Sequence, residues 1–355
     1  MKVIVAEFGS WHDECLYSSC YMFSQLGHEV VLAANSRLRS RVATSLSGVT
    51  SEQHYFDFGS SLAGLRELWR FRRFVLASGA SMLHINTAQG SLAWKFFLLP
   101  LPRRIAISGV LHNVAKLRGS VGQKLITRRI DRYVLLSDLL VDAYRATGCR
   151  VPSVVSYAIF QPHSEAVDAS VCKPAGERWL VVPGAVNYHR RDYETLLQLS
   201  LPEGVRVIIL GNINREDGPD FRARLAALPA AAQAHFMLFD SFVPNATFEA
   251  YLQQCDYLLP LVHTACNGLG KYLTDKISGT YNLSVIYRRP MLCPLTLQPY
   301  GAMADVALFY DREDAASLSA LLREGQLDKK EAEADLFRSP KWTFAYQLQQ
   351  MQAAF

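Results

Sequence analysis

The sequence lacks the short patterns that mark most metal and triphosphate sites. Its seven cysteines stand singly, without a C-x-x-C pair, so we expect reduced thiols rather than a disulfide framework or a zinc centre. No Asp-x-Asp pair is present to hold a divalent cation, and no metal site is predicted. No Walker A motif is present, which excludes a P-loop enzyme, and the absence of G-x-G-x-x-G weighs against a nicotinamide enzyme.

Long hydrophobic runs are missing as well. The most apolar stretch, residues 92–101, contains Lys95 and is too short to cross a bilayer. The chain opens directly on the strand-like run Lys2–Ala6, without the organisation of a signal peptide. We therefore expect a cytoplasmic protein, and the inner face of the membrane stays open as a docking place.

The features that are present are typical of a large globular protein. The chain has 355 residues, of which 50% are hydrophobic and 19% are charged, and this length predicts two domains. The charge is uneven, because residues 1–150 carry 19 Lys and Arg against 10 Asp and Glu, a net charge of +9, whereas the remaining residues carry −4. A basic half suits an anionic partner, which leaves anionic lipid, nucleic acid and anionic small molecules open.

Short apolar runs alternate with amphipathic helical patterns along the whole chain. Such runs are typical of buried parallel strands, and their rhythm breaks once, at residues 161–176. We therefore predict an α/β fold with two Rossmann-like, doubly wound parallel-sheet domains that face a cleft, at residues 1–160 and 177–335. Residues 161–176 are predicted as a linker, and residues 336–355 as a C-terminal helix that packs back on the body. The expected strands are Val3–Glu7, Val30–Ala34, Met82–Asn86, Ile105–Leu111, Tyr133–Leu136, Val154–Tyr157, Trp179–Val182, Val205–Leu210, Phe236–Phe239, Tyr257–Leu261, Pro290–Cys293 and Val306–Phe309.

One strand-to-helix junction in the second half has the chemistry of a diphosphate site. The run Val181–Tyr193 leads from a buried strand through a glycine turn at Gly184 to the pair Arg190 and Arg191 and then into a helix. Helix-end N–H groups, a favourable dipole and arginine forks are what a diphosphate needs. The alternative is a solvated helix start.

A second junction of the same kind follows about a hundred residues later. Lys276, Ser278, Gly279 and Thr280 form a polar helix start whose hydroxyl and N–H donors suit the same phosphates. An ordinary serine or threonine cap is the alternative for this junction. Two such junctions in one half predict a bound nucleoside diphosphate.

In their order and spacing these motifs resemble the GT-B glycosyltransferases, in particular the large retaining family of two-domain bacterial enzymes that build surface polysaccharides. The resemblance covers nearly the whole chain. It implies a nucleotide diphosphate sugar as the donor substrate in the C-terminal domain, an acceptor in the N-terminal domain, and no separate cofactor. The motifs that carry it are Val182–Val186, Arg190–Tyr193, Phe239–Pro244, Tyr251–Pro260, Lys276–Gly279, Arg289–Pro290, His112–Asn113 and Tyr133–Ser137.

The chain departs from this family pattern at two places. The family usually has Gly-Arg at the turn where this chain has Gly184 followed by alanine, so the resemblance gives the diphosphate to Arg190 and Arg191. The paired glutamates of the family fall on Thr274 and Asn282, and neither is acidic. The resemblance then leaves Asn282 to bind the ribose and Lys276 to bind a phosphate.

The resemblance also places residues around the base and the sugar. Phe242 and Val243 match the loop that holds the nucleotide base, and Asn212 follows a strand close to the nucleotide. His112 follows the strand Ile105–Leu111 and matches a histidine that reaches the donor sugar near the reacting carbon. His263 faces the same sugar. Each of these residues has a plain structural alternative. Phe242 and Val243 could form a hydrophobic staple before a helix, and Asn212 could belong to an ordinary strand-to-helix turn. His112 could be a strand-end histidine bonded to the backbone, and His263 an incidental loop histidine.

The loop after the first strand contains three further candidates. Gly9 would let the two domains close over the donor, His12 would contact substrate, and Asp13 would orient the acceptor hydroxyl or act as its base. A helix cap is the alternative for Asp13, since an acidic residue favours the positive end of a helix.

These expectations describe an enzyme, a metal-independent glycosyltransferase whose acceptor is a glycan or lipid-linked hydroxyl. Three alternatives stay open. One is a glycosyltransferase that modifies DNA, which the basic N-terminal half permits. Another is a sugar-nucleotide 2-epimerase of the same fold, and the third is a catalytically silent binding module, which the missing glutamates permit.

The basic residues of one predicted helix suggest a further partner. Arg66, Arg70 and Arg73 share one face of residues 65–76, flanked by Trp69. Basic residues edged by aromatics suit an anionic membrane surface. A solvated helix face and a nucleic-acid site are the alternatives.

Overall fold

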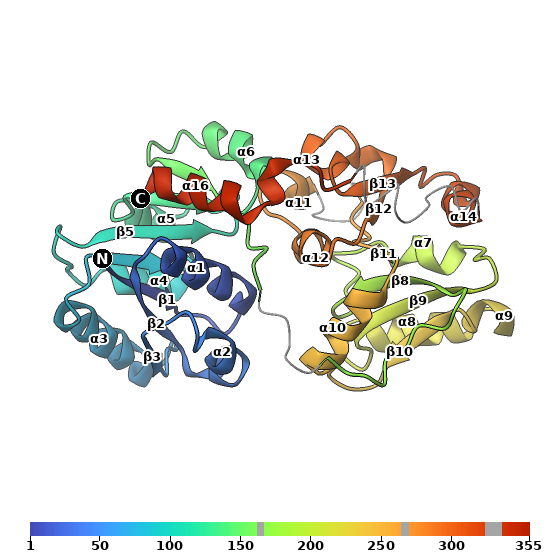
Figure 1. Cartoon of the computed structure of the whole chain (residues 1–355), viewed down its shortest axis with the longest axis horizontal. Helices are drawn as coiled ribbons and strands as arrows, with labels where there is room; N and C mark the ends of the chain where they lie inside the picture. Colours follow the sequence, from blue (N-terminus) through green and yellow to red (C-terminus); the bar gives the residue numbers. More distant parts are fainter. Residues whose placement is uncertain (162–166, 264–269, 324–335) are drawn as a thin grey trace. The chain divides into compact units, whose positions relative to one another are not determined.

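The computed structural model describes residues 1–161, 167–263, 270–323 and 336–355. The chain divides into two compact units. The first unit comprises Met1–Pro162, Thr274–Ile277 and Pro340–Phe355, and the second comprises His163–Leu273 and Ser278–Ser339. Each unit is built on its own parallel sheet with flanking helices, which confirms the predicted α/β fold class (Figure 1).

The first unit holds a seven-stranded sheet in the order β3-β2-β1-β4-β5-β6-β7, and every strand pair in it is parallel. The order reverses between β1 and β4, which pair from Val3 with Met82 to Ala6 with Ile85. Its elements are β1 (Lys2–Glu7), α1 (Asp13–Gln25), β2 (Glu29–Asn35), η1 (Ser36–Leu38), α2 (Arg39–Leu46), β3 (Glu52–Phe56), α3 (Leu62–Ala77), β4 (Met82–Ile85), α4 (Ser91–Phe97), β5 (Ala106–Leu111), η2 (Val114–Leu117), α5 (Val121–Thr127), β6 (Arg132–Leu135), η3 (Asp138–Leu140), α6 (Val141–Ala146), β7 (Ser153–Val155), η5 (Pro340–Trp342) and α16 (Phe344–Ala354).

The second unit holds a six-stranded sheet in the order β10-β9-β8-β11-β12-β13, again parallel throughout. Here the order reverses between β8 and β11. Its elements are β8 (Arg178–Pro183), α7 (Tyr193–Gln198), β9 (Val205–Asn212), α8 (Gly218–Ala226), α9 (Ala230–Gln233), β10 (Phe236–Phe239), α10 (Asn245–Gln254), β11 (Tyr257–Leu258), α11 (Gly270–Thr274), α12 (Gly279–Tyr287), β12 (Met291–Pro294), η4 (Leu295–Leu297), α13 (Gly301–Ala304), β13 (Ala307–Tyr310) and α14 (Ala315–Arg323). In the part of the chain that the structure describes, no helix is both long and apolar enough to cross a membrane.

Two strands differ from the sequence expectation by more than two residues at an end. The edge strand β3 was not expected, because its residues Glu52–Phe56 are mostly polar and half exposed and so lack the apolar run of a central strand. The strand β11 is only two residues long, whereas the apolar run predicted a strand through Leu261. Pro260 lacks an N–H for the sheet, and Leu261 has a left-handed φ of 51°, so the strand cannot continue.

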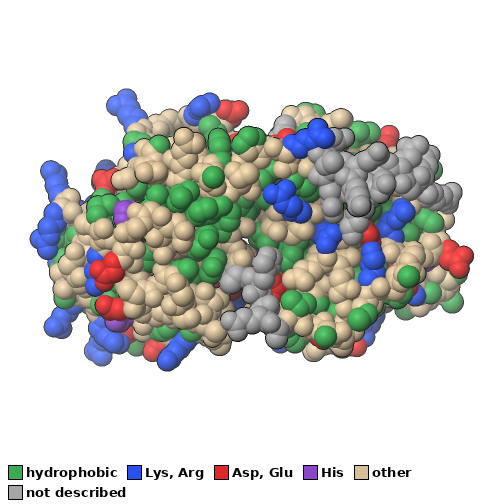
Figure 2. All heavy atoms as spheres, in the orientation of Figure 1, with side chains coloured by type: hydrophobic (Ala, Val, Ile, Leu, Met, Phe, Trp, Pro, Cys, Tyr) green, Lys and Arg blue, Asp and Glu red, His purple; other side chains and the backbone are tan. Residues whose placement is uncertain are grey.

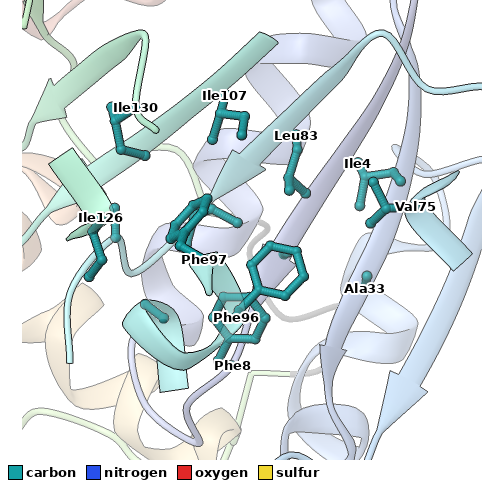
Figure 3. Packing of buried hydrophobic residues seen from close by; sticks show 14 of the residues in the cluster. Ile4, Phe8, Ala33, Val75, Leu83, Phe96, Phe97, Ile107, Ile126 and Ile130 are labelled. Carbon is teal, nitrogen blue, oxygen red and sulfur yellow. The ribbon is translucent and has the colours of Figure 1, made fainter. Parts of the chain in front are cut away.

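Alternate residues of β1 fill the core on opposite faces of the first sheet. Val5 joins the cluster under α1, while Ile4 joins the cluster on the other face. Figure 3 shows this second cluster, in which Phe8 and Phe96 pack with ring centroids 5.3 Å apart. The central strand β1 is therefore apolar from Val3 to Ala6, and its polar residues Lys2 and Glu7 lie at its ends.

The last helix of the chain, α16, packs on the first unit. Met351 lies in the cluster under α1. The side chain of Gln347 is fully buried, where it accepts a hydrogen bond from the N–H of Tyr157 at 3.1 Å and donates one to the carbonyl of Lys341 at 2.7 Å. The helix is thus held by apolar packing and by one buried amide.

The stretch 167–176, for which the sequence predicts a linker, lies against α10 of the second unit. Asp168 accepts a hydrogen bond from the hydroxyl of Thr247 at 2.7 Å. Gln254 donates one to the carbonyl of Val171 at 2.6 Å. These bonds attach the described part of the predicted linker to the second unit.

We expect Gln347→Leu to destabilise the first unit by about 1–3 kcal/mol, because leucine leaves the buried N–H of Tyr157 without an acceptor. Urea unfolding measures the effect. Gln349→Leu is the matched control, since Gln349 is exposed on the same helix. Equal unfolding midpoints for the two variants would show that the buried amide does not hold α16.

Candidate functional site

The strand order of each sheet reverses at one position, between β1 and β4 in the first unit and between β8 and β11 in the second (Figure 1). The crossovers that leave two such strands run to opposite faces of the sheet. Open α/β sheets bind their ligands at the carboxyl ends of these strands. The side chains that follow these four strands are therefore the first candidates for binding.

The turn after β8 consists of closely packed backbone. Gly184 has a φ of 92°, a left-handed conformation that favours glycine. A Cβ at Gly211, on the adjacent strand β9, would lie 2.3 Å from the carbonyl oxygen of Gly184. Two glycines are therefore required for this turn to pass so close to β9.

Arg191 is the arginine of the predicted pair that lies beside this turn. Its Nη2 is 3.7 Å from the position that a Cβ on Gly184 would take. Its Nη1 is buried and has no hydrogen-bond partner among the described residues. An unpaired buried guanidinium nitrogen is costly, and an anion at the turn would supply the missing acceptor. Arg190, by contrast, is exposed.

The neighbouring carboxylate of Asp192 fixes the helix start next to Arg191. It accepts hydrogen bonds from the hydroxyl of Thr195 at 2.7 Å and from Nε of Arg312 at 2.6 Å. The N–H of Asp192 donates to the carbonyl of Leu261 at 2.8 Å. Burial by itself raises the pKa of Asp192, but the bonds from Arg312 and Thr195 lower it below its ordinary value. The carboxylate of Asp192 thus joins the loops after β8 and β13, and its backbone N–H joins the loop after β11.

The start of α12 contributes two buried polar atoms. Ser278 caps the helix by accepting the N–H of Thr280 at 3.4 Å. Oγ1 of Thr280 and Oδ1 of Asn282 are buried without a hydrogen-bond partner among the described residues. A Cβ on Gly279 would meet nothing within 4 Å, so the space beside this residue is open.

Lys276 lies in the short segment Thr274–Ile277, which packs on the first unit. The N–H of Val114 donates to the carbonyl of Asp275 at 2.8 Å. Ile277 packs against the core of the first sheet. Lys276 and Thr274 therefore group with the first unit, whereas the cap of α12 belongs to the second.

The other candidates of the second unit differ in exposure. His263 is buried, and burial lowers its pKa. Val243 is buried, but its neighbour Phe242 is 74% exposed, which leaves an aromatic ring free to stack. The side chain of Asn212 accepts the backbone N–H two residues further on at 2.9 Å, which is the pattern of a turn.

In the first unit, the carboxylate of Glu7 lies at the point where the strand order reverses. Glu7 ends β1 and is 1% exposed. Its oxygens accept hydrogen bonds from the N–H of Gly9 at 2.6 Å, from Nδ2 of Asn86 at 2.7 Å and from the hydroxyl of Thr87 at 2.6 Å. Burial raises the pKa of Glu7, and these three donors oppose that rise. The carboxylate joins the loops that follow β1 and β4.

His12 and His112 are stacked beside this carboxylate, with ring centroids 3.9 Å apart. His12 has a left-handed φ of 64°, and its Nδ1 lies 3.4 Å from a carboxylate oxygen of Glu14. Nε2 of His112 bonds the carbonyl of Asn86 at 2.8 Å. Burial lowers the pKa of His112 to about 3, with His12 adding to the effect. Although burial also lowers the pKa of His12, Glu14 raises it above its ordinary value.

Asp13 and Gly9 complete the candidates of this loop. Asp13 is the first residue of α1, and Nη1 of Arg41 lies 3.0 Å from its carboxylate. Burial raises the pKa of Asp13, and Arg41 opposes the rise. A Cβ on Gly9 would lie 3.1 Å from the carboxylate of Glu7, so a glycine gives its N–H the closest approach.

The structure gathers six of the predicted residues into two groups, one at each reversal of strand order, and leaves the other predicted residues outside them. Gly9, His12, Asp13 and His112 belong to the first, and Gly184 and Arg191 belong to the second. Sequence reasoning missed four residues that hold these groups together. A charged side chain at the end of an apolar strand was the available signal for Glu7, while Arg312 lies far from its partner in sequence. The missed residues are Glu7, Asn86, Asp192 and Arg312.

The charges of these groups favour an anionic ligand in the second unit. Within the described ranges, no group of three or more His, Cys, Asp or Glu side chains is placed to hold a metal ion. The turn at Gly184 instead offers the guanidinium of Arg191, which is an anion-binding group.

The chain resembles solved structures over its full length, although no protein-family model and no curated protein matches its sequence. HepE from Anabaena, solved with UDP-glucose, has 14% identity and a TM-score of 0.68, with 100% of this chain and 99% of that chain covered. A glycosyltransferase from Rickettsia africae has 11% identity and a TM-score of 0.62, with 99% and 97% covered. MnaA from S. aureus, solved with UDP, has 8% identity and a TM-score of 0.60, with 99% and 95% covered. The chain therefore shares the two-domain α/β fold of these proteins.

Proposed function

We propose that this protein is a glycosyltransferase that moves a sugar from a nucleoside diphosphate sugar to a hydroxyl group of a glycan or lipid-linked acceptor. The observation that carries the proposal is Arg191, whose buried Nη1 has no acceptor among the described residues and lies beside the glycine turn of β8. A diphosphate fits this position by charge and by hydrogen bonding. The fold shared with HepE and with the glycosyltransferase from Rickettsia africae supports the reaction class.

The transfer breaks the bond between the anomeric carbon and the diphosphate oxygen, and its electron pair leaves with the nucleoside diphosphate. The acceptor oxygen forms the new bond to the anomeric carbon and loses its proton. Arg191 stabilises the charge that develops on the leaving diphosphate, with Arg190 as an exposed second cation. The family resemblance favours retention at the anomeric carbon.

The rest of the donor is assigned to polar groups of the second unit. Asn282 and Thr280 each have a buried oxygen without a partner in the part of the chain that the structure describes, and Asn282 takes the ribose in this assignment. Ser278 and the open space at Gly279 receive phosphate oxygens. The phosphate role of Lys276, which groups with the first unit, stays a prediction from the family resemblance. The exposed ring of Phe242 stacks on the base.

The acceptor is assigned to the first unit. His112 contacts the transferred sugar, and His12 contacts the acceptor. Asp13 receives the proton of the acceptor hydroxyl, and a pKa raised by burial makes its carboxylate a stronger base than an ordinary aspartate. Arg41, 3.0 Å away, holds the carboxylate in place.

We expect Arg191→Ala to weaken UDP binding by about 1.5–3 kcal/mol, because hydrogen bonds to a charged phosphate are lost. Arg190→Ala should weaken binding less, since Arg190 is exposed. Isothermal titration with UDP and with GDP measures both. Arg206→Ala is the matched control, because Arg206 lies at the other end of β9 and pairs with Glu177.

Two outcomes of this titration contradict the proposal at different levels. Unchanged affinity in Arg191→Ala would remove this residue from the diphosphate site. A wild-type protein that binds neither nucleotide, in titration or as a rise in melting temperature, would remove the proposed donor altogether.

We also expect transfer to continue when EDTA is present, because arginine, lysine and helix N-termini meet the charge of the leaving group. Product formation from UDP-glucose, with and without chelator, measures this. If chelation abolishes turnover and Mg²⁺ or Mn²⁺ restores it, a metal ion rather than these residues stabilises the charge on the leaving diphosphate.

Membrane docking of the acceptor side rests on one face of the first unit, here called the basic face. It consists of Arg66, Trp69, Arg70 and Arg73 on α3, together with the nearby segment Leu98–Arg104. Figure 2 shows Lys and Arg side chains along the outer edge of this unit, on the side where Figure 1 draws α3.

The basic face combines charge with exposed apolar surface. Trp69 is 53% exposed and Leu98 is 59% exposed. Arg72 joins the two segments by donating from Nε to the carbonyl of Pro100 at 2.7 Å. Arg103 is exposed in the second segment. Cations beside an exposed indole and leucine fit the interface of an anionic bilayer, which would suit a lipid-linked acceptor.

We expect the protein to co-sediment with anionic vesicles, with binding that falls as salt rises. The triple variant Arg66→Ala, Arg70→Ala, Arg73→Ala should lose affinity at about 1 kcal/mol per basic residue. Its matched control replaces three exposed basic residues elsewhere on the first unit with alanine. These control positions are Lys116, Lys124 and Arg128.

Equal binding to neutral and anionic vesicles, or binding to neither, would contradict membrane docking. Duplex DNA is the competitor in the same assay. Tight DNA binding that weakens with salt would favour a nucleic-acid acceptor for the proposed transferase.

A further inference from the structure

The carboxylate of Glu7 is unusually well supplied with donors for a side chain that is 1% exposed. The N–H of Gly9 binds one oxygen, and Asn86 and Thr87 bind the other, at distances of 2.6 to 2.7 Å. A buried carboxylate is weak evidence for stability, because apolar replacements of buried ion pairs are often no less stable. Its position suggests a role in holding the loops that it connects.

Asn86 extends the reach of Glu7 to both histidines. Its Nδ2 donates to Glu7 and also to the carbonyl of His12, 3.0 Å away. Its own carbonyl lies 2.8 Å from Nε2 of His112. The side chain of Glu7 therefore holds Asn86, whose side-chain amide binds the carbonyl of His12 and whose main-chain carbonyl binds the ring of His112.

The bond to Asn86 selects a single tautomer of His112. A carbonyl oxygen only accepts hydrogen bonds, so Nε2 of His112 must carry the hydrogen. Burial lowers the pKa of His112 to about 3, so the ring is neutral near pH 7. Nδ1 then keeps a lone pair and can accept a hydrogen bond from a hydroxyl group, such as one on a sugar.

The geometry points to Glu7 as a positioning residue that, through Asn86, holds His12 and His112 together and keeps His112 in the tautomer that accepts a sugar hydroxyl. Glu7 itself touches no substrate. This inference rests on the proposed function for the reaction that it serves, whereas the hold of Glu7 on His112 can be measured without any reaction.

Two substitutions of Glu7 remove different numbers of its acceptor oxygens. Glu7→Leu removes both oxygens. Glu7→Gln keeps one oxygen, so either the loop at Gly9 or the loop at Asn86 loses its acceptor. Glu29→Gln is the matched control. Glu29 lies at the amino end of the neighbouring strand β2, away from the loops that Glu7 binds, and forms an ion pair with Lys2. Circular dichroism and melting curves establish that each variant is folded.

The first measurement is the tautomer of His112, read from nitrogen NMR of histidine-labelled full-length protein. The wild type and Glu29→Gln should show the Nε2–H form alone. Glu7→Leu should show a mixture of tautomers and a shifted His12 signal, and Glu7→Gln should change at least one of the two histidine signals.

The second measurement is transfer from UDP-glucose together with UDP affinity. We expect kcat to fall roughly ten- to a hundredfold in Glu7→Leu, with a smaller fall in Glu7→Gln, because small displacements of reacting groups are costly. UDP affinity should stay within about two-fold of the wild type, since the diphosphate is assigned to the second unit.

The outcomes separate this inference from the proposed function. Unchanged histidine signals in both variants would overturn the positioning role, and if the leucine variant does not fold, the glutamine variant decides. Altered signals with unchanged kcat would also overturn it, because the positioning would then have no effect on transfer. A wild type that neither binds UDP nor transfers glucose would instead contradict the proposed function, while the NMR result still decides whether Glu7 holds His112.

Discussion

Two parallel strands must be joined by a crossover that carries the chain from the carboxyl end of one strand back to the amino end of the next. The arrangement of both units depends on this constraint. All the loops that follow the carboxyl ends of the strands therefore lie on the same side of the sheet. Where the strand order reverses, at β1 and β4 or at β8 and β11, successive crossovers run to opposite faces. These strands are buried on both sides and are mostly apolar, with His84 of β4 as a buried polar exception that bonds Ser108. The chemistry of each unit is consequently concentrated in the few residues that follow these strands.

A buried carboxylate holds the loops together at each of these positions. The carboxylate of Glu7 binds the loops after β1 and β4. The carboxylate of Asp192 binds the loop after β13, and its backbone N–H binds the loop after β11. Burying each carboxylate costs free energy, and the hydrogen bonds from several donors offset this cost. These bonds fix the loops relative to one another. Fixed loops are what a preorganised site requires, because donors that are already in place need no reorganisation during a reaction. Arg191 and His112 each lie next to such an anchor, which gives both side chains a defined environment.

Much of the fold could be predicted from residue patterns, since a continuous apolar run is a local signal of a buried strand. The edge strand β3 was not predicted, because its polar residues do not form an apolar run. The strand β11 is shorter than predicted, because Leu261 takes a left-handed conformation that an apolar run does not reveal. The glycine turn at Gly184 and the arginine pair were visible in the sequence. Which arginine lies beside the turn was not, because that depends on the direction of the helix start, which Arg312 fixes from a position 120 residues away.

The sequence by itself determined the two-unit α/β class, the glycine turn and the types of residue available at each strand end. These are local properties, set by hydrophobic periodicity and by backbone conformations that only certain residues adopt. Only the tertiary structure decided that Glu7 and Asn86 meet, and that Asn86 in turn fixes the tautomer of His112. Pairings across 79 and 26 residues arise from strand order, and strand order is chosen by the burial of whole sheets rather than by any short segment.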